Sequence, residues 1–306
     1  MPPKFLNICI CSCLRPGPLE VALTSLMRMD IPAGVRVEVT VVDNDPAGSA
    51  APVANKLAAS FPVPLHYVCE PRRGIPCARN RGVAEALRLE ADYLIFIDDD
   101  EWVESSWLVQ LYDCAVALGG NAVVSGYVIA DVPESTPALM AEFYQRKKGQ
   151  TGERLEYCAT NNVLIPITVV RDLGLRFDES RPFAGGEDTL FFTAVAARGI
   201  DIVNCVEAVV HETIPPSRIS AHWQARRKYS AGTTQAVQKI ACGRSRVRVF
   251  VSGVGQVLIS LVKSCLFMLL GRRRDCYRSW LKVCRSAGVI AGVFGAQLDF
   301  YKVIDK

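Results

Sequence analysis

The strongest candidate for chemistry is a run of acidic residues that directly follows an apolar stretch. Leu94–Ile97 is apolar, and Asp98, Asp99, Asp100 and Glu101 come next. Such an apolar run is typical of a central strand in a parallel sheet covered by helices on both faces. Carboxylates this close repel one another, and a hard divalent cation that also holds phosphates relieves the repulsion. The run predicts a metal site, with a solvated acidic turn as the alternative.

A second acidic pair stands where a catalytic base could lie. Gly185 and Gly186 precede Glu187 and Asp188, and an apolar, helix-forming segment follows. The glycines let the backbone pass close to a substrate, and a carboxylate within hydrogen-bond reach of a hydroxyl can remove its proton. Acidic residues are also favoured in any first helical turn, because the helix dipole stabilises them there. On the local sequence alone, both interpretations stay open.

Strands alternate with helices through the first part of the chain. The expected strands are 6–11, 35–42, 65–68 and 94–97, and the expected helices are 19–29, 51–61 and 77–89. This order predicts an α/β domain with a doubly wound sheet. Ligands of such sheets bind outside the carboxyl ends of the strands. The strands that end at Asp43 and Asp98 would therefore bring carboxylates to one edge of the sheet.

Arginines precede the acidic run, namely Arg72, Arg73, Arg79 and Arg81. Clustered arginines suit diphosphate recognition, although a solvated helix face is the alternative. The chain has no Gly-x-Gly-x-x-Gly turn after the first strand and no Gly-x-x-x-x-Gly-Lys loop. A nucleotide would thus bind this sheet without a Rossmann or P-loop cradle.

The composition limits the class of protein. The chain has 306 residues, 50% of them hydrophobic, which is enough for one substantial core and a smaller appendage. Its 12 cysteines lie scattered in apolar segments without a Cys-x-x-Cys pair, so we expect small buried side chains in a reducing, cytoplasmic compartment. The N-terminus enters a strand at once, so we expect no signal peptide. Nucleic-acid binding has little support, because the sheet edge is acidic.

The order of these segments resembles glycosyltransferase family 2, the inverting sugar transferases with the GT-A fold. The resemblance spans about residues 5 to 230 and rests on motifs in one order with compatible spacing. The matching segments are 8–16, 41–45, 74–82, 98–100 and 185–188. The last two are similar to the family's DxD and ED motifs. Within the family, the chain is most similar to transferases that build bacterial exopolysaccharide repeat units, such as the succinoglycan-type glucosyltransferases.

The resemblance implies roles for individual residues. Asp43 would contact the uracil of a UDP-sugar, Asp98 would lie by the ribose and diphosphate, and Asp100 would bind Mg²⁺ or Mn²⁺ directly. The other positions that it offers for donor binding are Ser12, Arg15, Arg73, Arg79 and Asp99. Because Asp99 and Glu101 add carboxylates to the usual Asp-x-Asp pattern, it stays open which oxygens contact the metal.

Glycosyl transfer from a nucleotide diphosphate to an alcohol needs two contributions. A metal can offset the charge of the leaving diphosphate as a Lewis acid, and a carboxylate can take the proton of the attacking hydroxyl. The motif order favours Asp188 as this base. A single displacement inverts the anomeric configuration, and the sequence nominates no nucleophile for a retaining route.

His211, one of 3 histidines, follows the apolar run Ala208–Val210. In several GT-A enzymes a late histidine joins the metal, so the resemblance offers His211 as a ligand, with a half-buried strand end as the alternative. The segment with Asn161 and Asn162 resembles the family's acceptor-side strand. The sugar and diphosphate could contact a later group, with a solvated basic helix face as the alternative: His222, Trp223, Arg226, Arg227 and Lys228.

The composition changes beyond Gly243. Val247–Leu270 is mostly apolar, lies between arginine clusters and reaches the roughly 20 residues that span a bilayer. A polar stripe runs along it, formed by Ser252, Gln256, Ser260, Lys263 and Ser264. A central lysine would cost roughly 2.5–3.5 kcal/mol in a bilayer. We therefore expect an amphipathic helix on a membrane surface, with its arginines on anionic headgroups.

Two alternatives to that membrane-surface helix are a helix packed on the domain and a true span. Residues 280–301 predict a second helix of the same kind, in which Gly288, Gly292 and Gly295 allow close packing. The net charge of +4 agrees with a cytoplasmic membrane face but is too small to decide it.

These features predict a catalytic domain at 1–243, with a nucleotide-binding half at 1–100 and an acceptor half at 101–243, and a membrane-associating helical region at 244–306. The predicted function is inverting transfer of a hexose from a UDP-sugar to a saccharide acceptor, lipid-linked, in cell-surface or exopolysaccharide synthesis at the inner membrane face. A sugar nucleotidyltransferase and a non-catalytic nucleotide-sugar- or lipid-binding module are the alternatives. The sequence carries no signal for an oligomeric state.

Overall fold

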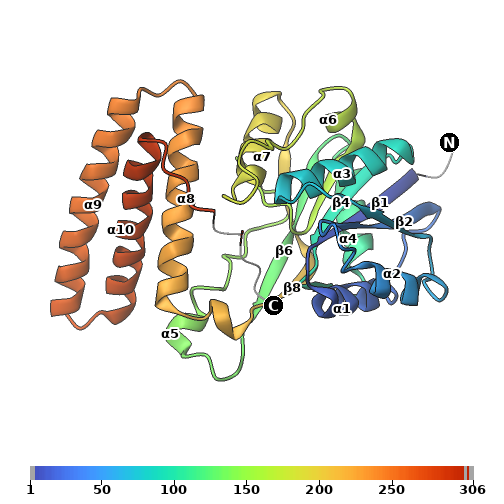
Figure 1. Cartoon of the computed structure of the whole chain (residues 1–306), viewed down its shortest axis with the longest axis horizontal. Helices are drawn as coiled ribbons and strands as arrows, with labels where there is room; N and C mark the ends of the chain where they lie inside the picture. Colours follow the sequence, from blue (N-terminus) through green and yellow to red (C-terminus); the bar gives the residue numbers. More distant parts are fainter. Residues whose placement is uncertain (1–3, 300–301, 303–306) are drawn as a thin grey trace.

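One mixed sheet lies between two layers of helices in the computed structural model, which describes residues 4–299 and 302 (Figure 1). The strands are β1 Lys4–Ser12, β2 Val35–Asp43, β3 Leu65–Cys69, β4 Tyr93–Asp98, β5 Glu101–Val103, β6 Val123–Asp131, β7 Val163–Pro166 and β8 Ile202–Thr213. The helices are α1 Pro16–Leu26, α2 Ala51–Ala58, α3 Ile75–Arg88, α4 Trp107–Ala117, α5 Ala138–Ala141, α6 Ile167–Arg171, α7 Glu187–Ala197, the 3-10 helix η1 Pro216–Arg218, α8 Ala221–Ala241, α9 Arg246–Leu269 and α10 Arg273–Val293.

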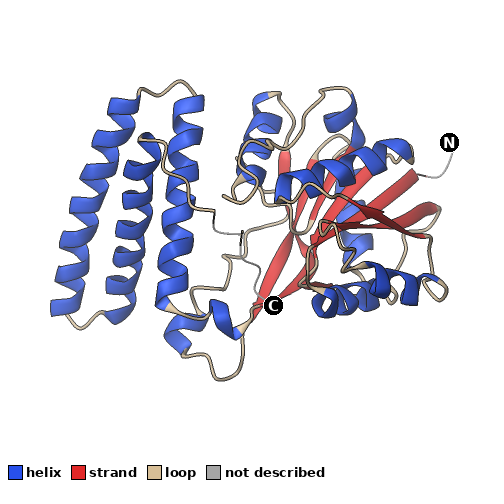
Figure 2. Ribbon diagram, viewed as in Figure 1, coloured by secondary structure: helices blue, strands red, loops and turns tan. Residues whose placement is uncertain are grey.

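The sheet, drawn in red in Figure 2, combines parallel and antiparallel pairing. Its strand order is β3-β2-β1-β4-β7-β6-β8-β5. Strands β1, β2, β3 and β4 pair in parallel, whereas β7 pairs antiparallel with both β4 and β6. Strand β8 runs parallel to β6 and antiparallel to β5. This architecture confirms the predicted α/β class with a mixed, helix-flanked sheet.

The parallel register places the predicted site residues at one edge of the sheet. Ser12 lies beside Asp43 in the β1–β2 ladder, and Cys11 lies beside Asp98 in the β1–β4 ladder. Because the carboxyl ends of these strands coincide, the acidic run and the end of β2 converge, as the strand order predicted.

Apolar side chains fill both faces of the sheet, which explains the continuous apolar runs of β1, β2 and β4. Helices α1, α2 and α4 cover one face, where Leu23 and Trp107 are fully buried against Ile95. Helices α3, α6 and α7 cover the other face, where Val83 and Phe191 pack in a second core layer (Figure 1).

Two helices start earlier than their predicted positions. Helix α1 starts at Pro16 instead of residue 19, and α3 starts at Ile75 instead of residue 77. Each has a proline in its first turn, where the missing N–H would have no partner within the helix and φ is already helical. These prolines therefore begin the helices.

The last three helices form a unit beside the α/β body, with α10 between α8 and α9 in the view of Figure 1. Helices α8 and α10 approach closely at glycines, since a Cβ on Gly288 would collide with the carbonyl oxygen of Tyr229 and one on Gly292 with backbone of Thr233. Gly295, with φ +82°, instead lies just beyond the end of α10. The predicted division at residue 243 thus falls between α8 and α9, although α8 packs against α10.

The observed α10 spans Arg273–Val293, whereas residues 280–301 were the predicted helix. It begins earlier because the arginine-rich segment after α9 is itself helical, and it ends before a left-handed glycine, which favours a helix stop. The end of the predicted range, residues 300 and 301, lies outside the described residues.

Helix α9 packs on α10 through its small residues and leaves its apolar side exposed. Gly253 and Ser260 are buried, and the Ser264 hydroxyl donates to the Cys276 carbonyl oxygen at 3.3 Å. Exposed apolar side chains cover the outward face, namely Val251, Leu258, Val262, Leu266 and Leu269. By length and composition α9 is the one described helix able to cross a membrane, and only 17% of its most apolar window is buried.

Gly288→Ala should destabilise the protein, because α8 and α10 must separate to admit a methyl group. Overpacking typically costs about 1–3 kcal/mol, which outweighs the roughly 0.5–1 kcal/mol that alanine gains over glycine in a helix. Urea unfolding measures the difference. Gly255→Ala in α9 is the matched control, because its Cβ would meet nothing within 4 Å. Equal stability of the two variants would contradict the close packing of α8 on α10.

Candidate active site

A cavity of about 490 Å³ opens at the carboxyl edge of the sheet, between the ends of β1 and β4, the start of α7 and the start of α8. Most of the predicted site residues line it: Ser12, Arg15, Arg73, Arg79, Asp98, Asp99, Asp100 and Asp188. Two do not, because the lining residues include neither Asp43 nor His211 among the residues that the structure describes.

Asp99 is held by protein donors. The Ser12 hydroxyl donates to Asp99 Oδ2 at 2.7 Å, and Arg15 Nη1 donates to Asp99 Oδ1 at 2.6 Å. Desolvation and the neighbouring charge of Asp100, opposed by Arg15, raise the pKa of Asp99 to about 7. With both oxygens occupied, Asp99 anchors the turn to β1 and α1.

Glu101 is also held by protein donors. Its Oε2 accepts the backbone N–H of Asp98 at 2.9 Å, and its Oε1 accepts from Asn161 Nδ2 at 3.0 Å. Burial raises the pKa of Glu101 well above its ordinary value, and the negative charge of Asp98 adds to the effect. Of the four consecutive acids, Asp98 and Asp100 are therefore the two left to face a ligand.

Three carboxylates from two segments line this part of the cavity: Asp98 and Asp100 in the acidic run, and Glu212 at the end of β8. Desolvation, together with the negative charges of Asp100 and Glu212 and against the opposing charge of Arg79, raises the pKa of Asp98 to about 6. Arg218 Nη1 lies 3.3 Å from Asp100 Oδ2 and 4.0 Å from Glu212 Oε1. Mutual repulsion among the carboxylates is the condition that a hard cation relieves.

These oxygens suit Mg²⁺ or Mn²⁺ as a shared site between protein and substrate. In the described part of the chain, no group of three or more His, Cys, Asp or Glu side chains is arranged to hold a metal ion. Mg²⁺ is usually bound through one or two carboxylates together with substrate phosphates. The donor set therefore fits a cation that arrives with a diphosphate.

Arg79 connects the acidic run to the start of α7. Its guanidinium is buried in an ion pair with Glu187 and lies 3.8 Å from Asp98 Oδ1. Burial raises the pKa of Glu187, against the opposing charge of Arg79. Arg73 is exposed, and Nη2 lies 3.9 Å from Cys13 Sγ. Of the two predicted phosphate contacts, Arg73 is thus the more available to a ligand.

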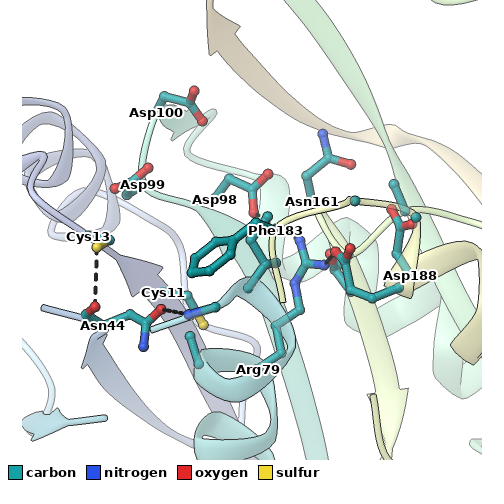
Figure 3. A pocket seen from close by; sticks show the side chains of 18 of the residues that line it. Cys11, Cys13, Asn44, Arg79, Asp98, Asp99, Asp100, Asn161, Phe183 and Asp188 are labelled. Atoms are coloured by element: carbon teal, nitrogen blue, oxygen red, sulfur yellow. Dashed lines mark hydrogen bonds and ion pairs between the residues drawn. The ribbon is translucent and has the colours of Figure 1, made fainter. Parts of the chain in front are cut away.

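Asp188 occupies the first turn of α7, on the opposite side of the cavity from β4 (Figure 3). Its Oδ1 accepts the Thr189 backbone N–H at 2.6 Å and the Thr189 hydroxyl at 3.3 Å. The preceding Gly186 has φ +85°, and a Cβ there would collide with Thr234. The glycine turn therefore fixes where α7 starts and lets Asp188 reach the cavity.

Asp43 has a structural environment that differs from its predicted contact with uracil. Its carboxylate is fully buried and accepts from the Asp45 N–H at 3.0 Å, the Ala50 N–H at 2.7 Å and the Tyr67 hydroxyl at 3.1 Å. These bonds fold the loop after β2, and the neighbouring Asn44 lines the cavity in its place.

His211 lies outside the cavity, unlike its predicted place at a metal. Its ring stacks on Trp102 with centroids 3.8 Å apart, and its nitrogens lie 3.2 Å from Asp131 Oδ1 and 3.3 Å from Glu104 Oε1. Successive side chains of a strand point to opposite faces, so Glu212 enters the cavity where His211 does not. The alternation along β8 was the signal that could have found Glu212.

The later sequence candidates divide in the same way. Trp223, Arg226 and Arg227 line the cavity from α8, and Asn161 lines it beside β7. Asn162 instead accepts from Trp107 Nε1 at 2.7 Å in the core. Arg146 and Arg218 line the cavity although no local sequence pattern singled them out, and neither His222 nor Lys228 is among the described lining residues.

Comparison with known proteins identifies the family. Residues 7–171 match the family described as Glycosyl transferase family 2. The chain belongs to glycosyl transferase family 2. This family 2 chain is 32% identical to the succinoglycan biosynthesis protein ExoM of Rhizobium meliloti (strain 1021) over 295 residues. The alignment covers 95% of this chain and 93% of that relative.

Solved structures support the fold of this family 2 glycosyltransferase. S. aureus TarS 1-349 in complex with UDP has a TM-score of 0.55 at 14% identity, covering 92% of this chain and 90% of that one. Its complex with UDP-GlcNAc has a TM-score of 0.54 at 15% identity, covering 96% and 92%. The predicted family and GT-A type fold are confirmed, and a glycosyltransferase replaces the nucleotidyltransferase and non-catalytic alternatives.

Proposed function

We propose that this glycosyltransferase moves a hexose from a UDP-sugar to a saccharide acceptor, with inversion and with a divalent metal, in the synthesis of a cell-surface polysaccharide. The observation that carries the proposal is one cavity with Asp98, Asp100 and Glu212 on one side and Asp188 on the other. The name of the related succinoglycan biosynthesis protein and the UDP and UDP-GlcNAc complexes of TarS support the pathway and the donor.

The donor half holds the nucleotide diphosphate. One or two of the carboxylates of Asp98, Asp100 and Glu212, together with the diphosphate oxygens, would hold Mg²⁺ or Mn²⁺, which would supply Lewis-acid stabilisation of the departing diphosphate. Arg73 and Arg226, which also line the cavity, add positive charge for the phosphates.

The acceptor half removes a proton. Asp188 Oδ1 is held by Thr189, and Oδ2 makes no hydrogen bond within the described residues, so it is available to an acceptor hydroxyl. As the acceptor oxygen bonds to the anomeric carbon, the bond from that carbon to the diphosphate oxygen breaks and the hydroxyl proton passes to Asp188. Glu187 does not compete, because Arg79 holds it in a buried ion pair.

A donor panel tests the proposal. UDP-glucose, UDP-galactose, UDP-GlcNAc and GDP-mannose are added with Mn²⁺, and the melting temperature and the release of nucleotide diphosphate are measured. We expect stabilisation by UDP-sugars and slow hydrolysis of one of them. A chain that no UDP-sugar stabilises or that hydrolyses none would contradict the proposed donor.

The membrane location is a further part of the proposal. Arginines stand at both ends of the apolar outward face of α9, including Arg246 and Arg248 at its start and Arg272 after its end. An apolar face flanked by cationic side chains suits the boundary between acyl chains and anionic headgroups. A lipid-linked acceptor would meet the catalytic cavity at such a surface.

Leu258→Asp should weaken binding to phosphatidylglycerol-containing vesicles at least about tenfold, because it removes one apolar anchor and adds repulsive charge. Leu258 is 59% exposed on α9. Val21→Asp on α1, where the valine is 56% exposed, is the matched control and should bind as the wild type does. Vesicle co-sedimentation measures the binding of both variants. A wild-type protein that binds neither anionic nor neutral vesicles would contradict the proposed membrane location.

A further inference from the structure

A second cavity of about 610 Å³ adjoins the donor cavity. The two cavities share Gly185, Gly186 and Arg227 as lining residues. Consecutive residues of α7 line different cavities, because Asp188 lines the first and Thr189 lines the second. The glycine turn before α7 therefore belongs to the walls of both cavities. A ligand in the second cavity would lie next to the carboxylate proposed as the base.

The walls of the second cavity are rich in hydroxyl and amide groups. They come from α7 and from one face of α8 and comprise Thr189, Thr193, Ser230, Thr234, Gln235 and Gln238. Several bonds position this wall, such as Gln238 Nε2 to Thr193 Oγ1 at 2.8 Å and Thr234 Oγ1 to the Gly185 carbonyl oxygen at 3.0 Å. A polar wall of this kind offers donors and acceptors to the hydroxyls of a sugar.

Two further lining side chains have no partner within the described part of the chain. Tyr157 is 50% exposed, and neither its side chain nor that of Gln235 makes a hydrogen bond or ring contact there. A tyrosine presents an apolar ring face and a polar tip, which matches the mixed surface of a saccharide. These groups are therefore free to take a ligand.

One arginine lines the same cavity without an ion-pair partner among the described residues. Arg285 of α10 is exposed, lines the cavity and makes no ion pair among the residues described. Glu156 is the one carboxylate among the described lining residues. An arginine without an ion pair in the wall of a polar cavity suits an anionic group on the ligand.

We propose that the second cavity binds the acceptor, as a saccharide that carries a phosphate or diphosphate group. The inference rests on the proposed function, because it takes Asp188 as the base. The sugar lies against Tyr157 and Gln235, and the phosphate lies against Arg285. The shared glycine turn then lets an acceptor hydroxyl reach Asp188 while the donor occupies the first cavity.

The probe is α-D-glucose 1-phosphate, titrated into full-length protein saturated with UDP and Mg²⁺, with glucose and inorganic phosphate as the other ligands. We expect glucose 1-phosphate to bind more tightly than either. Arg285→Glu should weaken it at least about tenfold, because a charge-assisted contact becomes repulsive. Tyr157→Ala should weaken glucose 1-phosphate and leave inorganic phosphate unchanged.

Arg273→Glu, the same charge change at an exposed position on the same helix, is the control and should match the wild type. Equal affinity of wild type and Arg285→Glu, or equal affinity for glucose and glucose 1-phosphate, would overturn the inference. So would binding that UDP abolishes, because the probe would then occupy the donor cavity. Absence of wild-type stabilisation by UDP would instead sink the proposed function.

Discussion

Asp188→Asn should lower glycosyl transfer by about 10²-fold or more and leave the affinity for the UDP-sugar almost unchanged, because proton removal and donor binding use different groups. The amide keeps the size of the side chain and its acceptor oxygen for Thr189. Turnover at saturating donor and direct titration of the donor separate the two effects.

Two other variants sharpen this result. Glu187→Gln should unfold more readily, because losing one partner of a buried ion pair typically costs about 3–5 kcal/mol, whereas Asp188→Asn should melt as the wild type does. Asp178→Asn, an exposed carboxylate outside the cavity, is the matched control for activity. If Asp188→Asn retains turnover, Asp188 is not the base, and Glu187 becomes the nearest candidate.

Asp100→Asn should remove the stabilisation that UDP gives in the presence of Mn²⁺. Ligand present at 100 times its dissociation constant stabilises a protein by about 2.7 kcal/mol, and that gain should disappear. The substitution weakens the contacts of the Asp100 side chain with Arg15, at 2.8 Å, and with Arg218, at 3.3 Å. The fold should survive, because Asp99 still pairs with Arg15. Thermal unfolding with UDP, Mn²⁺ and EDTA measures the effect.

His211→Ala is the discriminating control for the metal. Its ring lies between Trp102, Asp131 and Glu104, so the stabilisation by UDP and Mn²⁺ should persist. Glu212→Gln should reduce that stabilisation. UDP affinity that EDTA leaves unchanged would show that the carboxylates act without a metal, and a large loss only in His211→Ala would restore the histidine as the ligand.

Contiguous features of this site could be read from the sequence. Leu94–Ile97 and the acids after it form a strand and a turn, and the glycines before Asp188 form the start of a helix, because period and turn chemistry are local. Glu212, which was missed, reaches the cavity through the pairing of β8 with β5 and β6. That pairing is long-range, so the alternation along β8 separates Glu212 from His211 but does not show which of the two faces the cavity.

The same limit explains Asp43 and the helices at the end of the chain. Asp43 ends a strand at the site edge, as predicted, but its oxygens meet N–H groups of a loop whose turn only the tertiary structure defines. In α9, the polar stripe does not simply face water, since Ser260 and Ser264 pack on α10. Helical periodicity identifies the faces but not the partner that covers each one.

A crystal structure with UDP and Mn²⁺ tests the central claim most directly, because the anomalous signal of manganese locates the metal without assumptions. We expect one Mn²⁺ peak between the UDP diphosphate and the carboxylates of Asp98, Asp100 and Glu212, with Asp188 facing the space where the sugar would lie. UDP bound elsewhere, or in this cavity with the manganese peak at His211 or absent, would contradict it.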